Sequence, residues 1–154
     1  MYNNFDRQGK GGHMSRYNTR TSPKVGDIYM MEFYGQGSAQ DGFRPGLVVQ
    51  NNIGNKMSPN VVALPLTSVL KNMHQPTHVF LPAAETGLRA DSIVLCESPM
   101  SIPKSKIKSF KARLSKHYMR EVAKAFLLEH PVLCFLSLQE MTDVQQEAYS
   151  LIAE

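Results

Sequence analysis

The fold is decided by the segment Gly42-Phe43-Arg44-Pro45-Gly46-Leu47-Val48-Val49-Gln50-Asn51-Asn52. Its residues 47–49 are continuously apolar, which predicts a strand over residues 47–50 that is covered on both faces. Pro45 stands at the entry to this strand, where its missing N–H does least harm to the hydrogen-bond ladder. Because a proline keeps the residue before it out of the helical conformation, Arg44 is expected to be fixed at the rim of the sheet.

The side chain of Arg44 has the chemistry of a phosphate ligand. Its guanidinium group is planar and permanently charged, and its five N–H donors match the geometry of phosphate oxygens. The alternative interpretation is a surface arginine that flanks a strand. The segment alone leaves both interpretations open.

Further short strands are expected on both sides of this segment. They are predicted at 28–33, 61–67, 77–81, 92–97 and 107–110. Pro65, inside one of these stretches, implies an edge strand or a bulge. Short strands at near-regular spacing, with polar or glycine-rich turns at 34–42 and 51–60, predict a small, strongly bent antiparallel sheet or barrel.

Two helices are expected near the C-terminal end. Apolar residues recur at helical spacing after Ser115, a good N-cap, and predict a first helix over about 115–130. Ser137 and Glu140 have the spacing of a capping box, which predicts a second helix over 137–153 with its own apolar stripe. Both stripes are expected to pack against the sheet. The alternative for the second helix is a dimer interface.

Length and composition indicate one domain without a membrane segment. The chain has 154 residues, enough to bury a single core without disulfides. No apolar run approaches membrane-spanning length, and the N-terminal stretch lacks the apolar region of a secretory signal. Cys96 and Cys134 lie in apolar runs without metal-ligand spacing. We therefore expect two buried free thiols, no metal and a cytoplasmic location.

Residues 1–24 are expected to be a basic extension of a single domain at 25–154. Five basic residues stand there against Asp6 alone: Arg7, Lys10, Arg16, Arg20 and Lys24. This net +4 equals the net +4 of the whole chain, so the remainder carries 12 basic and 12 acidic groups. The polar composition predicts disorder, and the interleaved aromatic residues are typical of segments that stack on single-stranded bases. The alternative is a solvated tail without a role.

Motifs at four separated places carry a family resemblance. They are the Arg44 segment, Val61-Val62-Ala63-Leu64-Pro65-Leu66-Thr67, Pro76-Thr77-His78-Val79 and Asp91-Ser92-Ile93-Val94-Leu95-Cys96-Glu97. In this order and spacing they resemble the MazF/PemK/Kid family, toxins of toxin–antitoxin pairs that are sequence-specific endoribonucleases. The resemblance runs from about residue 25 to about residue 130. It implies a mainly β (α+β) fold, a small SH3-like, PemK-type antiparallel barrel with C-terminal helices.

The resemblance implies a metal-independent endoribonuclease that needs no cofactor and cleaves single-stranded mRNA. In the family an arginine and a threonine, at the positions of Arg44 and Thr67, are the main catalytic residues. The RNA 2′-hydroxyl attacks the adjacent phosphate and leaves a 2′,3′-cyclic phosphate and a 5′-hydroxyl. Arg44 suits stabilisation of the charge that develops, and the Thr67 hydroxyl can hydrogen-bond the phosphate or the attacking group. The alternative interpretation is that Thr67 only ends a strand, because threonine is a good β-former.

The chain departs from the family in the loop before Arg44. Where the family often carries a glutamate this sequence has Ala39, so a supporting carboxylate is expected from Asp41 or Glu97. His78 is interpreted as a surface or packing residue, although histidine is a usual general base in ribonucleases. Polar loop residues are candidates for RNA binding: Ser38, Gln40, Asn51, Ser68, His74, Gln75 and Ser98.

The resemblance also implies a set of partners. These are single-stranded RNA, a cognate MazE-like antitoxin with an acidic extended segment, a second copy in a homodimer, and operator DNA bound together with the antitoxin. No membrane partner is expected. Two other functions stay open, namely a non-catalytic toxin of the same fold that poisons DNA gyrase and a plain nucleic-acid-binding barrel. The combination of Arg44 with Thr67 favours the enzyme.

Overall fold

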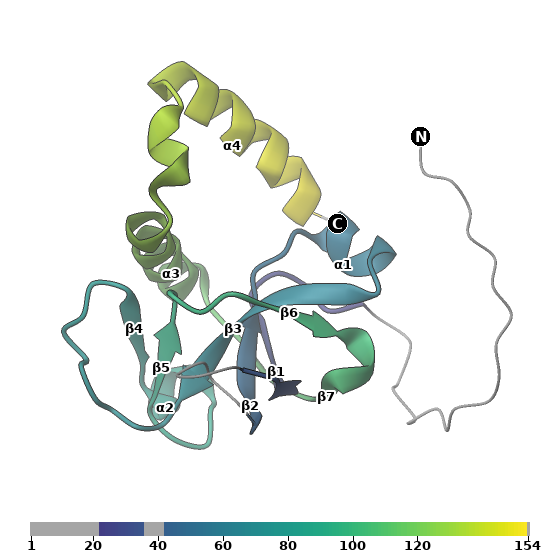
Figure 1. The fold of residues 1–154 in the computed structure, drawn as a ribbon, viewed down its shortest axis with the longest axis vertical. Coiled ribbons are helices and arrows are strands. Elements are labelled where there is room, and N and C mark those ends of the chain that lie inside the picture. Colours follow the sequence, from purple (N-terminus) through teal and green to yellow (C-terminus); the bar gives the residue numbers. More distant parts are fainter. Residues whose placement is uncertain (1–21, 36–41, 154) are drawn as a thin grey trace, which may run out of the picture.

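The computed structural model describes residues 22–35 and 42–153, and within them a bent antiparallel sheet forms the body of the molecule (Figure 1). Its seven strands are β1 (Asp27–Phe33), β2 (Gly42–Val48), β3 (Asn60–Thr67), β4 (His78–Leu81), β5 (Ser92–Leu95), β6 (Met100–Pro103) and β7 (Ile107–Arg113). They are ordered β4-β5-β3-β2-β1-β7, and β6 pairs with β3. The prediction of a mainly β, barrel-like fold with C-terminal helices is confirmed.

The helices stand between and after the strands. They are α1 (Asn52–Met57), α2 (Ala83–Thr86), α3 (Lys116–Glu129) and α4 (Leu138–Ile152), with 3-10 turns at Lys104–Lys106 (η1) and Pro131–Phe135 (η2). Helix α1 replaces the long turn expected at 51–60 and begins after Asn51, whose side chain accepts a hydrogen bond from Gly54 N at 2.8 Å. Among the described helices, none is long and apolar enough to cross a membrane.

Strand β2 begins earlier than the sequence predicts. The expected bounds of 47–50 are wrong at both ends, because residues from Gly42 onward already pair with β1. Pro45 is therefore the fourth residue of the strand and lies opposite Met30 of β1. Proline is tolerated at this position because β3 pairs with β2 only from Gly46 onward. Pro45 therefore precedes the stretch of β2 that is hydrogen-bonded to both β1 and β3.

Pro65 lies where strand β3 changes its partner. On one side β3 pairs with β2, and on the other it pairs first with β6, from Asn60 to Ala63. The same side pairs with β5 through Leu66 and Thr67. Pro65 falls in the gap between these two partners, where a missing N–H breaks no ladder. The expected edge or bulge is thus a change of neighbour within a central strand.

The sheet is covered on both faces by apolar side chains. One cluster joins the sheet to α3 and includes Ile28, Leu47, Leu64, Leu81, Val94, Val122 and Ala125. The second lies on the opposite side and includes Met31, Phe33, Val48, Val61, Ala63, Ile102 and Ile107. Leu47 and Val48 are both fully buried but belong to different clusters, as expected for a strand covered on both faces.

Gly46 marks the closest approach between β2 and the side chains of β1. A Cβ atom at this position would lie 2.7 Å from Phe33 Cζ and 2.8 Å from Met31 Sδ. Both neighbours are fully buried, so neither has free space into which to move. The glycine therefore lets β2, and with it Arg44 two residues earlier, lie tightly against β1.

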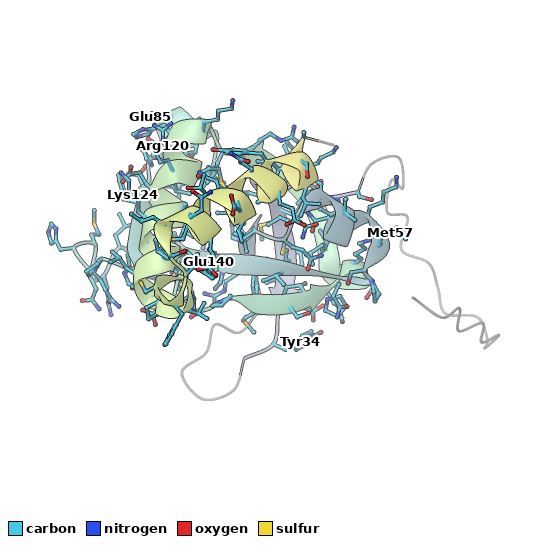
Figure 2. All side chains as sticks on the ribbon, turned by 90° about the horizontal axis from the view of Figure 1, so that it is seen from above. Tyr34, Met57, Glu85, Arg120, Lys124 and Glu140 are labelled. Atoms are coloured by element: carbon cyan, nitrogen blue, oxygen red, sulfur yellow. The ribbon has the colours of Figure 1, made fainter. Side chains whose placement is uncertain are left out.

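The two C-terminal helices differ in how they contact the sheet. Helix α3 follows its N-cap Ser115 and buries Val122 and Ala125 in the core. Helix α4 has the capping box that the sequence predicts, but none of its residues is buried. The expectation that its apolar stripe packs against the sheet is therefore wrong for the described part of this single chain. Figure 2, a view from above, shows α4 running from the side of α3, near Glu140, toward α1, which ends at Met57.

The segment between these helices is also uncovered. Phe135 of η2 is 91% exposed, and the neighbouring Cys134 is an exposed free thiol, whereas Cys96 is buried. The expectation of two buried thiols is thus correct for Cys96 only. Cys134 differs because the apolar residues around it have no element of the described chain packed over them.

Candidate active site

An open groove of about 830 Å³ lies where several elements of the sheet end. The first residues of β2, the end of β3, the segment after α2 and the middle of β7 line it. Its polar and charged side chains are Arg44, Thr67, Ser68, Arg89, Ser92, Ser109 and Lys111. These residues are far apart in the sequence and meet only because the sheet bends.

The groove carries one sign of charge. Arg44, Arg89 and Lys111 line it, and the described lining residues include no aspartate or glutamate. Three cations in the lining favour a positive potential, which attracts polyanions such as nucleic acids. The rim is partly apolar, since Phe43 is 56% exposed and Val69 is 57% exposed. Exposed flat side chains beside cations are typical of surfaces that bind single-stranded nucleic acid.

Arg44 is positioned by the pairing of the first two strands. It is the third residue of β2 and lies opposite Met31 of β1. Pro45 follows it and restricts its backbone to extended conformations. The side chain is half-buried and lines the groove.

Thr67 is positioned at the end of β3, opposite Ile93 of β5. Its Oγ1 accepts a hydrogen bond from the backbone N–H of Val69 at 3.1 Å. A hydroxyl that accepts one hydrogen bond still has its own proton to donate. The turn after β3 thus orients the Thr67 hydroxyl as a donor at the groove.

The predicted RNA-binding residues separate into three groups. Ser68 lines the groove together with Arg44 and Thr67. Four others do not line it: Asn51 caps α1, Gln75 Nε2 donates to Thr77 Oγ1 at 3.2 Å, His74 lies in the exposed loop before β4, and Ser98 N donates to Leu95 O at 3.2 Å. Ser38, Gln40 and Asp41 lie outside the described residues.

Glu97, one of the two candidate carboxylates, is held away from the groove lining. Its Oε1 lies 2.9 Å from His78 Nε2, and His78 Nδ1 lies 3.0 Å from the carbonyl oxygen of Asn72. This chain of contacts ties the loop after β3 to the end of β5. The other candidate carboxylate, Asp41, lies outside the described residues, next to Gly42 in the sequence.

Sequence reasoning missed Arg89, Ser92, Ser109 and Lys111. Ser109 and Lys111 are two residues apart in β7, a spacing that places side chains on one face of a strand. That alternation was visible in the sequence, but the place of β7 in the groove that Arg44 also lines was not. Arg89 follows the left-handed Gly87 that ends α2, and no local pattern indicates which way that loop runs.

Nothing in the described ranges suggests a metal centre. No group of three or more histidine, cysteine, aspartate or glutamate side chains there could hold a metal ion. The groove offers cations, hydroxyls and apolar surface as its binding groups.

Comparison with known proteins identifies the family. The family described as "PemK-like, MazF-like toxin of type II toxin-antitoxin system" matches residues 24–129. The chain is 36% identical over 101 residues to the endoribonuclease MazF of Staphylococcus saprophyticus, an alignment that covers 65% of this chain and 84% of that protein. It is 33% identical over 113 residues to the endoribonuclease EndoA of Bacillus subtilis, with coverages of 73% and 97%.

Solved structures show the same relationship. MazF of Deinococcus radiodurans is 26% identical with a TM-score of 0.63, and the alignment covers 72% of this chain and 98% of that one. The MazE–MazF crystal structure from the same organism contains a chain with a TM-score of 0.58, also 26% identical, with coverages of 72% and 97%. The protein belongs to the PemK/MazF-like family of type II toxins, and the resemblance found in the sequence is confirmed.

Proposed function

We propose that the protein is a sequence-specific endoribonuclease that cleaves single-stranded mRNA without a metal ion. The observation that carries this proposal is the groove that Arg44 and Thr67 share with Arg89 and Lys111, with no acidic residue in its described lining. A polyanion with unstacked bases fits its cations and its apolar rim. Relatives 33–36% identical to this chain are named endoribonucleases, which supports the same class of substrate.

The proposed reaction uses a hydroxyl of the RNA itself as the nucleophile. The 2′-hydroxyl attacks the adjacent phosphorus and gives up its proton, the bond to the 5′-oxygen breaks, and the leaving 5′-oxygen takes up a proton from solvent, so that a 2′,3′-cyclic phosphate and a 5′-hydroxyl result. Arg44 stabilises the extra negative charge on the phosphate oxygens as this bond exchange proceeds. The Thr67 hydroxyl donates a hydrogen bond to one of those oxygens and helps to hold the phosphate in line.

The proton of the attacking 2′-hydroxyl requires an acceptor. Ala39 occupies the position of the family's glutamate, and Glu97 is engaged by His78 at 2.9 Å. Asp41 is therefore the carboxylate that we propose as the general base. Asp41→Asn is expected to flatten the acidic side of the pH–rate profile, which a purely structural role for this residue would leave in place.

Arg89 and Lys111 are proposed to bind the phosphates on either side of the scissile one. Cations on a groove wall contact the RNA backbone and contribute affinity, whereas base edges supply the sequence information. The cleavage sequence is thus set by the loops around the groove and not by these two residues.

The activity is proposed to be controlled by an antitoxin. A protein related to this chain is found with MazE in a MazE–MazF crystal structure, and the groove of this chain is complementary to an acidic segment. Such a segment would occupy the phosphate sites and exclude RNA. We further propose a cytoplasmic homodimer, operator DNA binding together with the antitoxin, and growth inhibition through mRNA cleavage.

The test is incubation of the purified protein with mixed single-stranded RNA in EDTA, followed by analysis of the new ends. Fragments with 2′,3′-cyclic phosphate and 5′-hydroxyl ends are expected. Intact RNA, or cleavage only after a divalent metal is added, would refute the proposed reaction. A protein that instead arrests DNA gyrase would be the non-catalytic toxin of the same fold.

Variants assign the residues. Arg44→Ala is expected to lower kcat/KM on the order of 10²–10³-fold, as removal of a charge-stabilising donor does. Thr67→Val removes one hydrogen bond and is expected to cost about tenfold. Arg120→Ala is the matched control, because Arg120 lies on α3 away from the groove lining. Cleavage by Arg44→Ala at the rate of the Arg120→Ala control would remove Arg44 from the mechanism.

A further inference from the structure

Helix α4 presents an apolar surface that the described chain leaves uncovered. Leu138 is 84% exposed, Val144 is 50% exposed and Ile152 is 44% exposed. A 15-residue helix is marginal in water by itself and takes most of its stability from burial of one face. The contacts of α4 with its own chain therefore account for only part of what stabilises it.

The charge of this region restricts what can cover it. Residues 131–154 contain four acidic residues, Glu140, Asp143, Glu147 and Glu154, and no lysine, arginine or histidine. At about 3.6 residues per turn, the first three of these lie on one flank of the apolar stripe of α4. A suitable partner is basic and also carries apolar or aromatic side chains. A second α4 is a poor partner because it brings the same carboxylates.

Residues 1–21 of the same chain have this composition. Their basic residues are Arg7, Lys10, Arg16 and Arg20 against Asp6 alone, a net charge of +3. Tyr17 lies between Arg16 and Arg20, and Tyr2 and Phe5 precede Arg7. This segment and α4 both lie outside the family match at 24–129, so the chain carries two added segments of opposite charge.

The structure places the start of the described chain beside the C-terminal end of α4. The chain enters the described structure at Ser22, and the Val25 N–H donates to Asn52 Oδ1 at 2.9 Å. The Nδ2 group of the same Asn52 donates to the carbonyl oxygen of Ile152 at 3.0 Å. One buried side chain therefore joins the start of the domain to the C-terminal end of α4, as the arrangement in Figure 1 allows.

We propose that residues 1–21 bind along the exposed apolar and acidic side of α4 in the same molecule. Their cations pair with Glu140, Asp143 and Glu147, and their aromatic side chains cover the stripe. The reach is sufficient, since 21 residues extend up to about 70 Å and α4 is about 22 Å long. Attachment beside the helix end gives an effective concentration on the order of millimolar, so weak contacts suffice. This surface is distinct from the groove and does not depend on the proposed reaction.

Hydrogen exchange measured by mass spectrometry on the full chain tests the proposal. We expect exchange of the α4 amides to accelerate about tenfold when residues 1–21 are deleted, and similarly at high salt, which screens the ion pairs. The double variant Asp143→Asn/Glu147→Gln is expected to show the same acceleration. Glu140 is left unchanged because it closes the capping box with Ser137. The matched control is Glu121→Gln/Glu129→Gln on α3.

Each alternative gives a different result. Protection of α4 that is unchanged by the deletion overturns the proposal. Protection that rises with protein concentration shows that a second copy covers the helix, and it overturns the proposal as well. Equal acceleration in the α3 control would mean that the charge pairing with α4 is not specific, which also contradicts it.

Discussion

Replacement of Gly46 by alanine tests how tightly β2 is held against β1. The new Cβ would lie 2.7 Å from Phe33 Cζ, whereas ordinary contacts of such atoms begin at 3.4 Å, so the ring or the strand must move by 0.7 Å. Phe33 is fully buried, and Met31, whose Sδ would lie at 2.8 Å, is fully buried on the same side. Neither side chain can relieve the overlap without displacing other core atoms.

The expected cost follows from the behaviour of overpacked cores. One extra carbon in a filled core typically destabilises by about 1–3 kcal/mol. Alanine also lowers the conformational entropy of the unfolded chain relative to glycine, which offsets the destabilisation by about 0.4–1 kcal/mol. The net loss in unfolding free energy is therefore about 1–2 kcal/mol, which lowers Tm by roughly 2–8 °C for a domain of this size.

Thermal and urea unfolding of Gly46→Ala, measured beside Gly54→Ala, provide the assay. Gly54 lies inside α1, where an added Cβ meets only the side chain of Gln50 and where alanine is the better helix former, so its stability should be unchanged or higher. In the Phe33→Leu background the cost of Gly46→Ala should shrink by about 1 kcal/mol, because the nearer of the two clashing atoms is gone while Met31 Sδ remains. A Gly46→Ala protein as stable as Gly54→Ala, or the absence of this coupling, would refute the steric argument.

Two further results are expected. Arg89→Ala and Lys111→Ala should each weaken binding of single-stranded RNA and lower the slope of log K against log salt by about 0.7. Lys124→Ala on α3 is the control and should leave this slope unchanged. Equal slopes in all three variants would show that Arg89 and Lys111 do not contact phosphates. Burial raises the pKa of the Cys96 thiol to about 12. At pH 8 only the exposed Cys134 should therefore react with a thiol reagent until the protein is denatured. Two rapidly reacting thiols in the native protein would contradict the buried position of Cys96.

Features of the fold that are set by neighbouring residues could be predicted from the sequence. The helix starts after Ser115 and Ser137 depend on side chains three residues away, and both are found where expected. The bounds of β2 depend instead on its register with β1, which no local pattern contains. Apolar periodicity likewise indicated that α4 has an apolar face, but periodicity carries no information on what covers such a face.

The candidate site shows the same division. Arg44 was recognisable because Pro45 constrains it locally, and Thr67 because it ends an apolar run. Arg89 and Lys111 reach the groove from other elements, so their position depends on the bend of the whole sheet.

A charge count over all of residues 25–154 also conceals how charge is distributed along the chain. The balance of 12 against 12 in residues 25–154 averages a basic body with an acidic C-terminal segment. Residues 22–130 contain 13 basic and 8 acidic residues, and residues 131–154 contain none against 4. The field around the groove is therefore stronger than the overall balance suggests.

The change of partner at Pro65 has a mechanical consequence for the groove. Strands β4 and β5 are hydrogen-bonded to the other described strands only through Leu66 and Thr67 of β3. Thr67 thus lies where β3 pairs with β5, and Arg44 lies on the part of the sheet formed by β1 and β2. Pro65 of β3 lies at the joint between these two parts. Because its ring fixes one backbone angle, this joint resists torsion. The core cluster that joins β4 and β5 to α3 also holds these two parts of the sheet together. Under the proposed mechanism, a more pliable residue in place of Pro65 is expected to loosen the spacing between the guanidinium group and the hydroxyl, and with it the alignment of the bound phosphate.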